Sequence, residues 1–439
     1  MGGTYQAMNK IIPGAYINFK AVPQPLMKVG DRGIATTAIE CNWGKEGELV
    51  SLMSTDMFDG TFQKKFGDTD RLVPELILSN AYKVLVYRLN TGGVKATVPV
   101  GTNLVATAKY SGTFGNKLRV SVVAKDDKFE VTTYIETVPV DVQVGATVED
   151  IKSNEYVTFS GTGVLTVTAA VQLIGGTNGL TSASTAYEAY FKLLKTAKFQ
   201  TLAITNNHDT ANPLANAFVL SMREDNGKKI QVVTKSTTDD YEGLIKTKQG
   251  YKTALSTITV DMFPAWVAGA TAGCPINESL TAKVIDGATS IIGEETREEI
   301  IEDLKNGFFL LSATADGGVM VVKDINSLHT FTPDKGYDFS KNRVIRVLDE
   351  IAMTVSSTFE KSYMGKVSNT EQYRNVFKSD LISYINGLTN MDAVQEFDSA
   401  TDIRIRVGAA LDEIIVDADI MPVDSMEKLY MTVNVRGAN

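Results

Sequence analysis

The hydrophobic pattern of this chain changes twice, and each change falls at a run of glycine residues. Between Val94 and Gly179 the segments are short, rich in β-branched residues and alternating in polarity, as strands are. Thr91-Gly92-Gly93 opens this stretch, and Gly175-Gly176-Thr177-Asn178-Gly179 closes it. Because the flanking sequence has a different pattern, glycine-rich connections at both ends predict an all-β module inserted into another domain.

The sequence on both sides of this insertion predicts an α/β domain. Helical repeats alternate there with short, buried apolar runs, which is typical of a largely parallel sheet covered by helices. The expected strands are 33–38, 84–88, 201–205, 230–234, 308–311 and 319–322. The expected helices are 70–82, 187–194, 212–224, 264–272 and 294–306.

The sequence from residue 342 onward predicts a separate α+β domain. A first helix carries one apolar face, made by Val344, Val347, Leu348, Ile351 and Val355. A second helix, 369–391, carries an apolar stripe made by Tyr373, Val376, Phe377, Leu381 and Tyr384. Core packing explains both stripes without a cofactor. Strands are expected at 402–407 and 413–416.

The two ends of the chain carry strand patterns that have no evident partner in the same chain. In Leu429–Val435, apolar residues alternate with polar ones, as in a half-buried strand. Ile11–Phe19 is a second strand-like run, interrupted by a Pro13-Gly14 turn signal. A terminal strand needs an edge to pair with, because unpaired backbone groups cost free energy. Both ends therefore suggest a chain that completes sheets in its neighbours.

At 439 residues the chain is too long for one compact core, so several domains are expected. The predicted fold class is multidomain, with an α/β core that holds an inserted all-β domain, followed by an α+β domain. The predicted segments are an N-terminal arm at 1–25, the α/β core at 26–92 and 180–335, the β domain at 93–179, the α+β domain at 336–428 and a C-terminal arm strand at 429–439.

Composition narrows the classes of partner. The net charge is −9, whereas proteins that bind free nucleic acid are more often basic. No apolar run reaches the roughly 18 residues of a transmembrane helix, and the N-terminus lacks a secretory pattern. Cys41 and Cys274 are too widely spaced for a disulfide framework or a zinc motif, so free thiols in a reducing cytoplasm are expected. We expect neither a nucleic-acid partner nor insertion into a membrane.

The residues that usually carry catalysis are scarce. The only histidines are His208 and His329, and His208 follows an expected strand, where α/β sites form. Its neighbours Asn206, Asn207 and Asp209 more simply make a polar turn and helix cap. No phosphate-binding loop is present, and the glutamates of 294–299 suit a helix N-terminus better than a metal. The prediction is no catalytic residue, no cofactor and no metal.

Charge is divided between two parts of the C-terminal region. Residues 341–378 contain seven basic and four acidic side chains, whereas 392–427 contain ten acidic and two basic ones. Ordinary solvated faces are one interpretation. The other is a dipolar domain that docks on complementary surfaces.

Several segments resemble the tail sheath proteins of contractile bacteriophages and phage-tail-like bacteriocins, in the form carried by Gram-positive bacteria. Ile12-Pro13-Gly14-Ala15-Tyr16 is similar to the start of that family. The segments 108–122, AKYSGTFGNKLRVSV, and 173–179, LIGGTNG, are similar to family segments in the β module. The stretch 419–433, DIMPVDSMEKLYMTV, is the most similar to the family. The order and spacing of these segments agree along nearly the whole chain.

The resemblance implies a structural subunit that stacks in helical rings around an inner tube and contracts to drive the tube through a bacterial envelope. It implies that terminal arms are exchanged between subunits and add strands to sheets in the C-terminal domains. The exchanged strands here would be Ala15, Tyr16, Ile17, Asn18 and Phe19, and Leu429, Tyr430, Met431, Thr432, Val433, Asn434 and Val435.

The resemblance also implies partners and a location. The partners would be other copies of the chain, the tail tube protein, and baseplate and terminator proteins. The C-terminal domain would face the tube, with Lys361, Lys366, Arg374 and Lys378 as candidates to meet an acidic surface. The particle would be a virion or a tail-like particle, assembled in the cytoplasm of the host bacterium. Contraction of a metastable sheath needs no nucleotide, so the missing phosphate loop is consistent.

Two other functions remain open from the residues alone. One is an α/β hydrolase-like enzyme with a β insertion, which would use His208 and nearby acids. The other is a different self-assembling shell or surface-layer protein.

Overall fold

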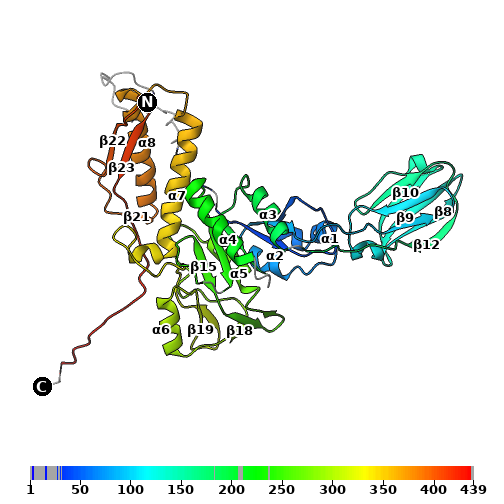
Figure 1. The fold of residues 1–439 in the computed structure, drawn as a ribbon, viewed down its shortest axis with the longest axis horizontal. Helices are drawn as coiled ribbons and strands as arrows, with labels where there is room; N and C mark the ends of the chain where they lie inside the picture. Colours follow the sequence, from blue (N-terminus) through cyan, green and yellow to red (C-terminus); the bar gives the residue numbers. More distant parts are fainter. Residues whose placement is uncertain are drawn as a thin grey trace. The chain divides into compact units, whose positions relative to one another are not determined.

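The computed structural model describes residues 2–3, 15–16, 27, 30, 32–181, 183–205, 211–235 and 238–436 (Figure 1). The chain divides into two compact units. One unit comprises Asp31–Met353 with Pro422–Asn439, and the other comprises Met1–Gly30 with Thr354–Met421. The mixed α/β, multidomain architecture expected from the sequence is confirmed.

A six-stranded sheet forms the centre of the larger unit. Its order is β15 (Leu244–Thr247), β14 (Gln231–Lys235), β13 (Thr201–Ala203), β3 (Ile34–Ile39), β5 (Lys83–Arg88) and β4 (Leu49–Met53). Neighbouring strands are parallel except for β4, which runs antiparallel to β5 at the edge. The largely parallel sheet predicted from the sequence is confirmed. The edge strand β4 was not predicted, although four of its five residues, LVSLM, are apolar.

Helices pack against both faces of this sheet. Along β5, Val84 and Val86 belong to one apolar cluster, whereas Leu85 and Tyr87 pack in a second one. The first cluster contains side chains of α2 (Leu72–Leu78) and α5 (Phe263–Gly273), and the second contains those of α3 (Ala183–Leu194) and α4 (Ala211–Leu220). Gly269 lets α5 approach α2, because a Cβ at this position would lie 2.3 Å from the carbonyl oxygen of Ile77.

The inserted stretch forms two antiparallel sheets around one core, which Figure 1 shows in cyan. One sheet has the order β11 (Val157–Gly161), β7 (Leu104–Ala108), β6 (Thr97–Val100). The other has the order β10 (Val138–Gly145), β9 (Lys128–Ile135), β8 (Leu118–Lys125), β12 (Thr168–Gln172). As the alternation predicts, Leu118, Val120 and Val122 are buried together in the shared core.

Arg88, the last residue of β5, hydrogen-bonds to backbone near both connections of the β module. Its guanidinium is buried and donates hydrogen bonds to the carbonyl oxygens of Ser111 (3.0 Å) and Asn178 (3.1 Å). It also donates to the carbonyl oxygens of Gly44 (2.9 Å) and Asn90 (3.1 Å). One side chain therefore holds backbone from both ends of the insertion and from the domain that carries it.

The rest of the larger unit consists of short elements. They are α1 (Thr61–Phe66), β16 (Gly250–Thr253), β17 (Thr257–Ile258), β18 (Ala288–Ile292), α6 (Arg297–Lys305), β19 (Leu311–Ala313) and β20 (Val319–Val321). The strand predicted at 308–311 begins only where that prediction ends. Phe308 takes part in an isolated bridge with Lys246 instead, next to the end of β15.

The smaller unit combines two helices with short strands. The helix α7 (Asn342–Thr358) begins in the larger unit and ends in the smaller one, where a π-helical turn, Phe359–Tyr363, continues it. The elements that follow are α8 (Glu371–Thr389), β21 (Val394–Gln395), β22 (Ile403–Val407), β23 (Ile414–Ala418) and, at the boundary between the units, β24 (Met421–Pro422). At the N-terminus, β1 (Gly2–Gly3) pairs in parallel with β2 (Ala15–Tyr16).

The apolar stripe predicted for α8 is only partly correct. Phe377, Leu381 and Tyr384 are buried, but Tyr373 is 41% exposed and Val376 is 46% exposed. These two residues lie in the first two turns of the helix, close to Phe377, which is buried. The helical period alone does not show where along a helix its packing begins.

Candidate assembly site

The C-terminal arm, Leu429–Val435, presents an uncovered apolar surface. No strand is assigned to it within the described part of the chain, which extends to residue 436. The apolar and aromatic side chains that are 70–89% exposed are Leu429, Tyr430, Met431, Val433 and Val435. Burial of apolar surface is worth about 25 cal/mol per Å², so a contiguous stripe of this kind marks an interaction surface.

The segment that precedes the arm is anchored to the larger unit. The ammonium group of Lys341, whose side chain is only 4% exposed, is ion-paired with Glu427 and lies 3.2 Å from Asp424. The hydroxyl of Thr281 donates a second hydrogen bond to the Glu427 carboxylate, at 2.9 Å. Burial lowers the pKa of Lys341, but the hydrogen bond and charge of Glu427, with Asp424, outweigh burial and raise it. The arm therefore starts from a fixed point.

The expected N-terminal arm strand is described only in part. Ala15 and Tyr16 form β2, while Ile17, Asn18 and Phe19 lie outside the described residues. The short parallel pair of β1 and β2 shows that this backbone takes strand geometry.

In the part of the chain that the structure describes, β22 and β23 pair only with each other. The two strands pair antiparallel from Ile403 opposite Ala418 to Val407 opposite Ile414, and they form a two-stranded sheet. Among the described residues no further strand pairs with either outer edge. An exposed edge offers backbone N–H and C=O groups to a strand from another chain.

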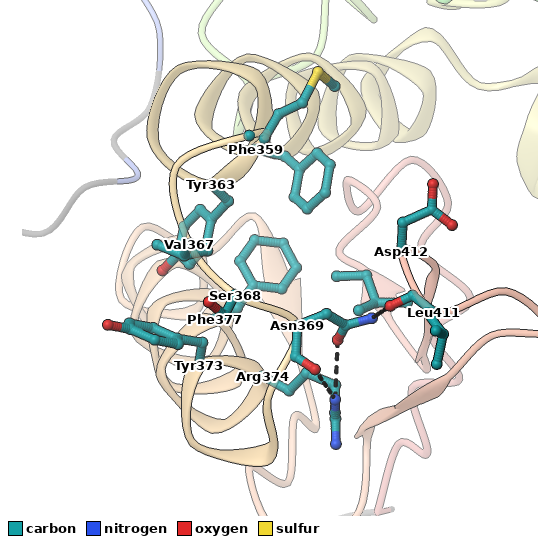
Figure 2. Close-up of a pocket in the computed structure, with 13 residues that line it drawn as sticks. Phe359, Tyr363, Val367, Ser368, Asn369, Tyr373, Arg374, Phe377, Leu411 and Asp412 are labelled. Atoms are coloured by element: carbon teal, nitrogen blue, oxygen red, sulfur yellow. Dashed lines mark hydrogen bonds between the residues drawn. The ribbon is translucent and has the colours of Figure 1, made fainter.

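A cavity of about 590 Å³, here called the aromatic pocket, lies between the hairpin and the two helices (Figure 2). The rings of Phe359, Tyr363 and Phe377 pack together at one side, with Tyr363 and Phe377 centroids 4.8 Å apart. Its other lining residues are Met364, Gly365, Val367, Ser368, Asn369, Tyr373, Arg374, Leu411, Asp412 and Ile414.

Asn369 connects the start of α8 to the hairpin at the edge of the pocket. Its side-chain amide donates to the carbonyl oxygens of Leu411 (2.8 Å) and Glu413 (3.0 Å). Arg374 in turn donates to the backbone and side-chain oxygens of Asn369, at 3.1 and 2.9 Å, as Figure 2 shows. These hydrogen bonds connect the start of α8 to the loop between β22 and β23.

The four basic residues predicted to face a tube differ in their surroundings. Lys361 and Lys366 are exposed on the turn that borders the aromatic pocket, and the Lys366 ammonium donates to the carbonyl oxygen of Lys361. Arg374 is half-buried and bound to Asn369, and Lys378 is half-buried one helical turn further along α8. Lys361 and Lys366 are thus more exposed than Arg374 and Lys378.

The residues considered for catalysis do not form a site in the described structure. His208 and its neighbours lie outside the described residues. The imidazole Nδ1 of His329 lies 2.8 Å from the carbonyl oxygen of Ser327 and 3.3 Å from Asp240, a structural contact. Where the chain is described, no group of acidic, histidine and cysteine side chains is arranged to hold a metal ion.

The glutamate cluster at 294–299 has structural partners. Glu295 pairs with Lys248, and Glu299 caps α6 through Thr296. None of the described helices has the length and apolar character required to cross a bilayer.

Sequence reasoning did not find the aromatic pocket or the Lys341–Glu427 anchor. Two of the residues that line the pocket, Tyr373 and Phe377, belong to the apolar stripe predicted for α8. The Lys341–Glu427 anchor gives no signal in the sequence, because 86 residues separate its two charges.

Comparison with known proteins agrees with this architecture. Three family models match the chain: the phage tail sheath protein beta-sandwich domain at 91–178, the phage tail sheath protein central domain at 181–327 and the phage tail sheath C-terminal domain at 334–436. The phage-like element PBSX protein XkdK of Bacillus subtilis is 32% identical over 99% of both chains.

Solved structures share the fold. The sheath tail protein of Desulfitobacterium hafniense is 38% identical, with a TM-score of 0.83 over 95% of this chain and 99% of that one. The sheath tail protein Lin1278 of Listeria innocua is 31% identical, with a TM-score of 0.81 over 91% and 94%. The helical sheath of the anti-feeding prophage in its contracted state is 12% identical, covers 97% and 99%, and has a TM-score of 0.61, a likeness of fold. This chain therefore belongs to the phage tail sheath protein family, and it is a structural subunit of a tail sheath.

Proposed function

We propose that this chain polymerises into a contractile sheath in which terminal arms join neighbouring copies by strand exchange. The observation that carries the proposal is the Leu429–Val435 arm, an alternating stripe 70–89% exposed at its apolar positions. The β22–β23 hairpin has no further strand partner among the described residues. The solved relatives of the same fold in contracted sheaths support it.

Strand exchange suits a structure that must move without coming apart. Hydrogen bonds between strands of neighbouring copies hold the polymer together, while the connections to each strand allow the domain bodies to rotate. The Lys341–Glu427 anchor fixes one end of the C-terminal connection. Energy for contraction would be stored in a metastable extended state, so the subunit needs no catalytic residue and no cofactor.

The partners follow from this role. The tube would bind the C-terminal domain through Lys361, Lys366, Arg374 and Lys378, and baseplate and terminator proteins would close the two ends of the sheath. One of the structures that share the fold is an anti-feeding prophage baseplate. The domain borders remain those predicted from the sequence, with 93–179 as a peripheral module. The particle would be a virion or tail-like particle assembled in the bacterial cytoplasm.

Electron microscopy of the purified full-length chain tests the polymer. The proposal predicts hollow, striated cylinders of helically stacked rings. A protein that stays monomeric at high concentration, under conditions where its fold is intact, would rule out self-assembly of this kind.

A further inference from the structure

Helix α6 has one side that no described part of the chain covers. None of its nine residues is buried. Ile300 and Leu304 are half-buried on the side that faces the domain. Glu298, Ile301 and Glu302, spaced i, i+3 and i+4, share the opposite side, where Ile301 is 46% exposed. A helix of a folded domain normally buries one face, so an exposed isoleucine on a helix without a buried residue indicates a face that a partner covers.

The position of α6 is nevertheless fixed. The ammonium group of Lys248 lies 2.5 Å from the Glu295 carboxylate and is also ion-paired with Asp303. Thr296 caps the helix, and its backbone N–H donates to the Glu299 carboxylate at 2.8 Å. The exposed side is therefore presented by a formed and anchored helix.

The exposed side of α6 is negatively charged. The segment 294–305 contains six acidic and two basic side chains. Lys248 balances one of these negative charges. Lys305 lies 3.6 Å from Glu302, but both side chains are more than 65% exposed, and such pairs contribute little. A cationic partner would therefore complement this face.

A cationic surface of matching size lies at the ends of α3 and α4. This lysine surface consists of four exposed or half-buried side chains, Lys192, Lys195, Lys198 and Lys228. The Lys228 ammonium donates to the carbonyl oxygen of Lys195, which places the segment after α3 beside the turn after α4. The nearest acidic residues in the sequence are only two, Glu188 and Asp225.

The lysine surface also offers an apolar contact. The rings of Phe191 and Phe218 stack with centroids 4.6 Å apart, so the ends of α3 and α4 lie side by side. Leu220, the last residue of α4, is 44% exposed there. Lysine side chains add the apolar part of their stems to such a surface. It therefore matches Ile301 as well as the two glutamates of α6.

The two surfaces belong to opposite faces of the central sheet. The helices α3 and α4 pack in the cluster that contains Tyr87. The helix α6 connects β18 to β19, whose buried residues Ala288 and Leu311 belong to the cluster on the other face. Complementary surfaces on opposite faces join copies head to tail, and such a contact continues as a ring or a helix instead of closing as a two-fold dimer.

We propose that the exposed side of α6 in one copy binds the lysine surface of a second copy of this chain. Glu298 and Glu302 meet the lysines, and Ile301 packs against Leu220. The inference rests on the proposed polymer but not on its arms. It adds a contact between the α/β domains of adjacent copies, and the complementary charges give this contact one orientation.

An exchange of charges tests the contact. One variant combines Glu298→Lys with Glu302→Lys, and the other combines Lys192→Glu with Lys195→Glu. Each variant alone opposes like charges, so we expect its sedimenting, polymerised fraction to fall at least tenfold. A 1:1 mixture restores opposite charges at every contact and should sediment like the unmodified chain. All four positions are exposed, so circular dichroism and Tm should not change.

The matched control combines Asp127→Lys with Glu155→Lys, at two exposed positions of the β module, and should polymerise normally. It makes the same change in net charge as the α6 variant. Two folded variants that polymerise normally on their own would overturn the inference. So would a mixture that sediments no better than either variant alone.

Cysteine cross-linking tests the contact independently of the polymer. Ile301→Cys is placed in one preparation and Leu220→Cys in another, and the two are mixed with a short bismaleimide. The native thiols do not compete, because Cys41 is 3% and Cys274 is 5% exposed. The inference predicts a cross-linked dimer with one chain of each variant. Equal cross-linking to Val123→Cys, an exposed position of β8, would overturn it.

The inference and the proposed function fail in different ways. If the unmodified chain forms no cylinders, the proposed polymer is wrong, and the cross-link still decides whether the contact exists. If cylinders form without this cross-link, the polymer stands and the contact between α6 and the lysine surface is wrong.

Discussion

The buried ammonium of Lys341 is ion-paired with Glu427, two residues before the C-terminal arm begins. This pair joins the start of α7 to a segment 86 residues later in the chain. It therefore limits the exposed, movable part of the C-terminus to Lys428 and the residues that follow. Under the proposed strand exchange, the length of this part would determine how far a neighbour can move while the arm stays paired.

Replacing Lys341 by Met should free the segment at Asp424 and Glu427 that precedes the arm. The substitution leaves Glu427 and Asp424 without their cation, and an unsatisfied buried polar group costs about 1–3 kcal/mol. We expect trypsin to cleave after Lys428 at least fivefold faster, with little change elsewhere. The control is Lys361→Met, which removes an exposed cation. Equal cleavage rates in the two variants would show that Lys341 does not anchor the segment.

The anchor should persist to strongly alkaline pH. The pKa of Lys341 is raised in the folded chain, whereas an unfolded lysine has a pKa of about 10.4. The ion pair therefore contributes its full stability below about pH 10.4 and loses it as the pH rises through the raised value. The Tm difference between the unmodified chain and Lys341→Met should be constant from about pH 7 to 9 and shrink above about pH 10.5. A difference that already disappears by about pH 8 would contradict this assignment.

Arg88→Met should loosen both connections of the β module. The variant removes the donor to four carbonyl oxygens, including those of Ser111 and Asn178, and the cost of leaving such buried acceptors unpaired is about 3 kcal/mol or more. Hydrogen exchange should accelerate at 91–93 and 175–179 before the core of the module is affected. Arg119→Met, at a half-buried position of β8, is the control. Uniform exchange along the module would argue that the connections are not held by Arg88.

Asp349→Asn should weaken the contact between α7 and the π-helical turn that follows α4. Arg223, in the π-helical turn Ser221–Asp225 after α4, donates two hydrogen bonds of 2.7 Å to the Asp349 carboxylate. Removing one charge of a buried pair typically costs about 3–5 kcal/mol. We expect a lower Tm in differential scanning calorimetry, and little effect from Glu360→Gln, which lies in an exposed turn. An unchanged Tm in Asp349→Asn would show that the pair is not structural.

The native thiols should be unreactive. Burial raises the pKa of Cys41 to about 12 and also raises that of Cys274, so both stay protonated at neutral pH. A thiol reagent should label neither cysteine in the folded chain and both after denaturation. Rapid labelling of the native protein would place at least one of them at the surface.

Local patterns predicted much of the fold because their signal repeats every two or 3.6 residues. Val120 alternates with polar neighbours and is buried, and Phe377 lies on a helical stripe and is buried. Trp43 could not be placed in this way. It precedes the insertion by about 50 residues, yet it packs inside the core of the β module, and its indole N–H donates to the carbonyl oxygen of Lys64 at 3.1 Å. Contacts of this kind depend on the tertiary fold, which brings together segments that are distant in the sequence.

The candidate site also has one part that a local sequence pattern predicts and one part that it does not. The alternation in Leu429–Val435 is a local pattern, so the arm was visible in the sequence. The aromatic pocket combines Phe359, Asn369 and Ile414 from three segments, and no periodicity links them. The exposure of Met431 and Val433 became evidence for a partner only once the structure showed that the arm remains uncovered.

The most direct test of the account is the assembly of a chain that lacks residues 429–439, followed by electron microscopy and sedimentation. The account predicts a folded protein, with circular dichroism and Tm close to those of the full chain, that no longer forms cylinders. Normal cylinders from the truncated chain would contradict the claim that the C-terminal arm joins one subunit to the next.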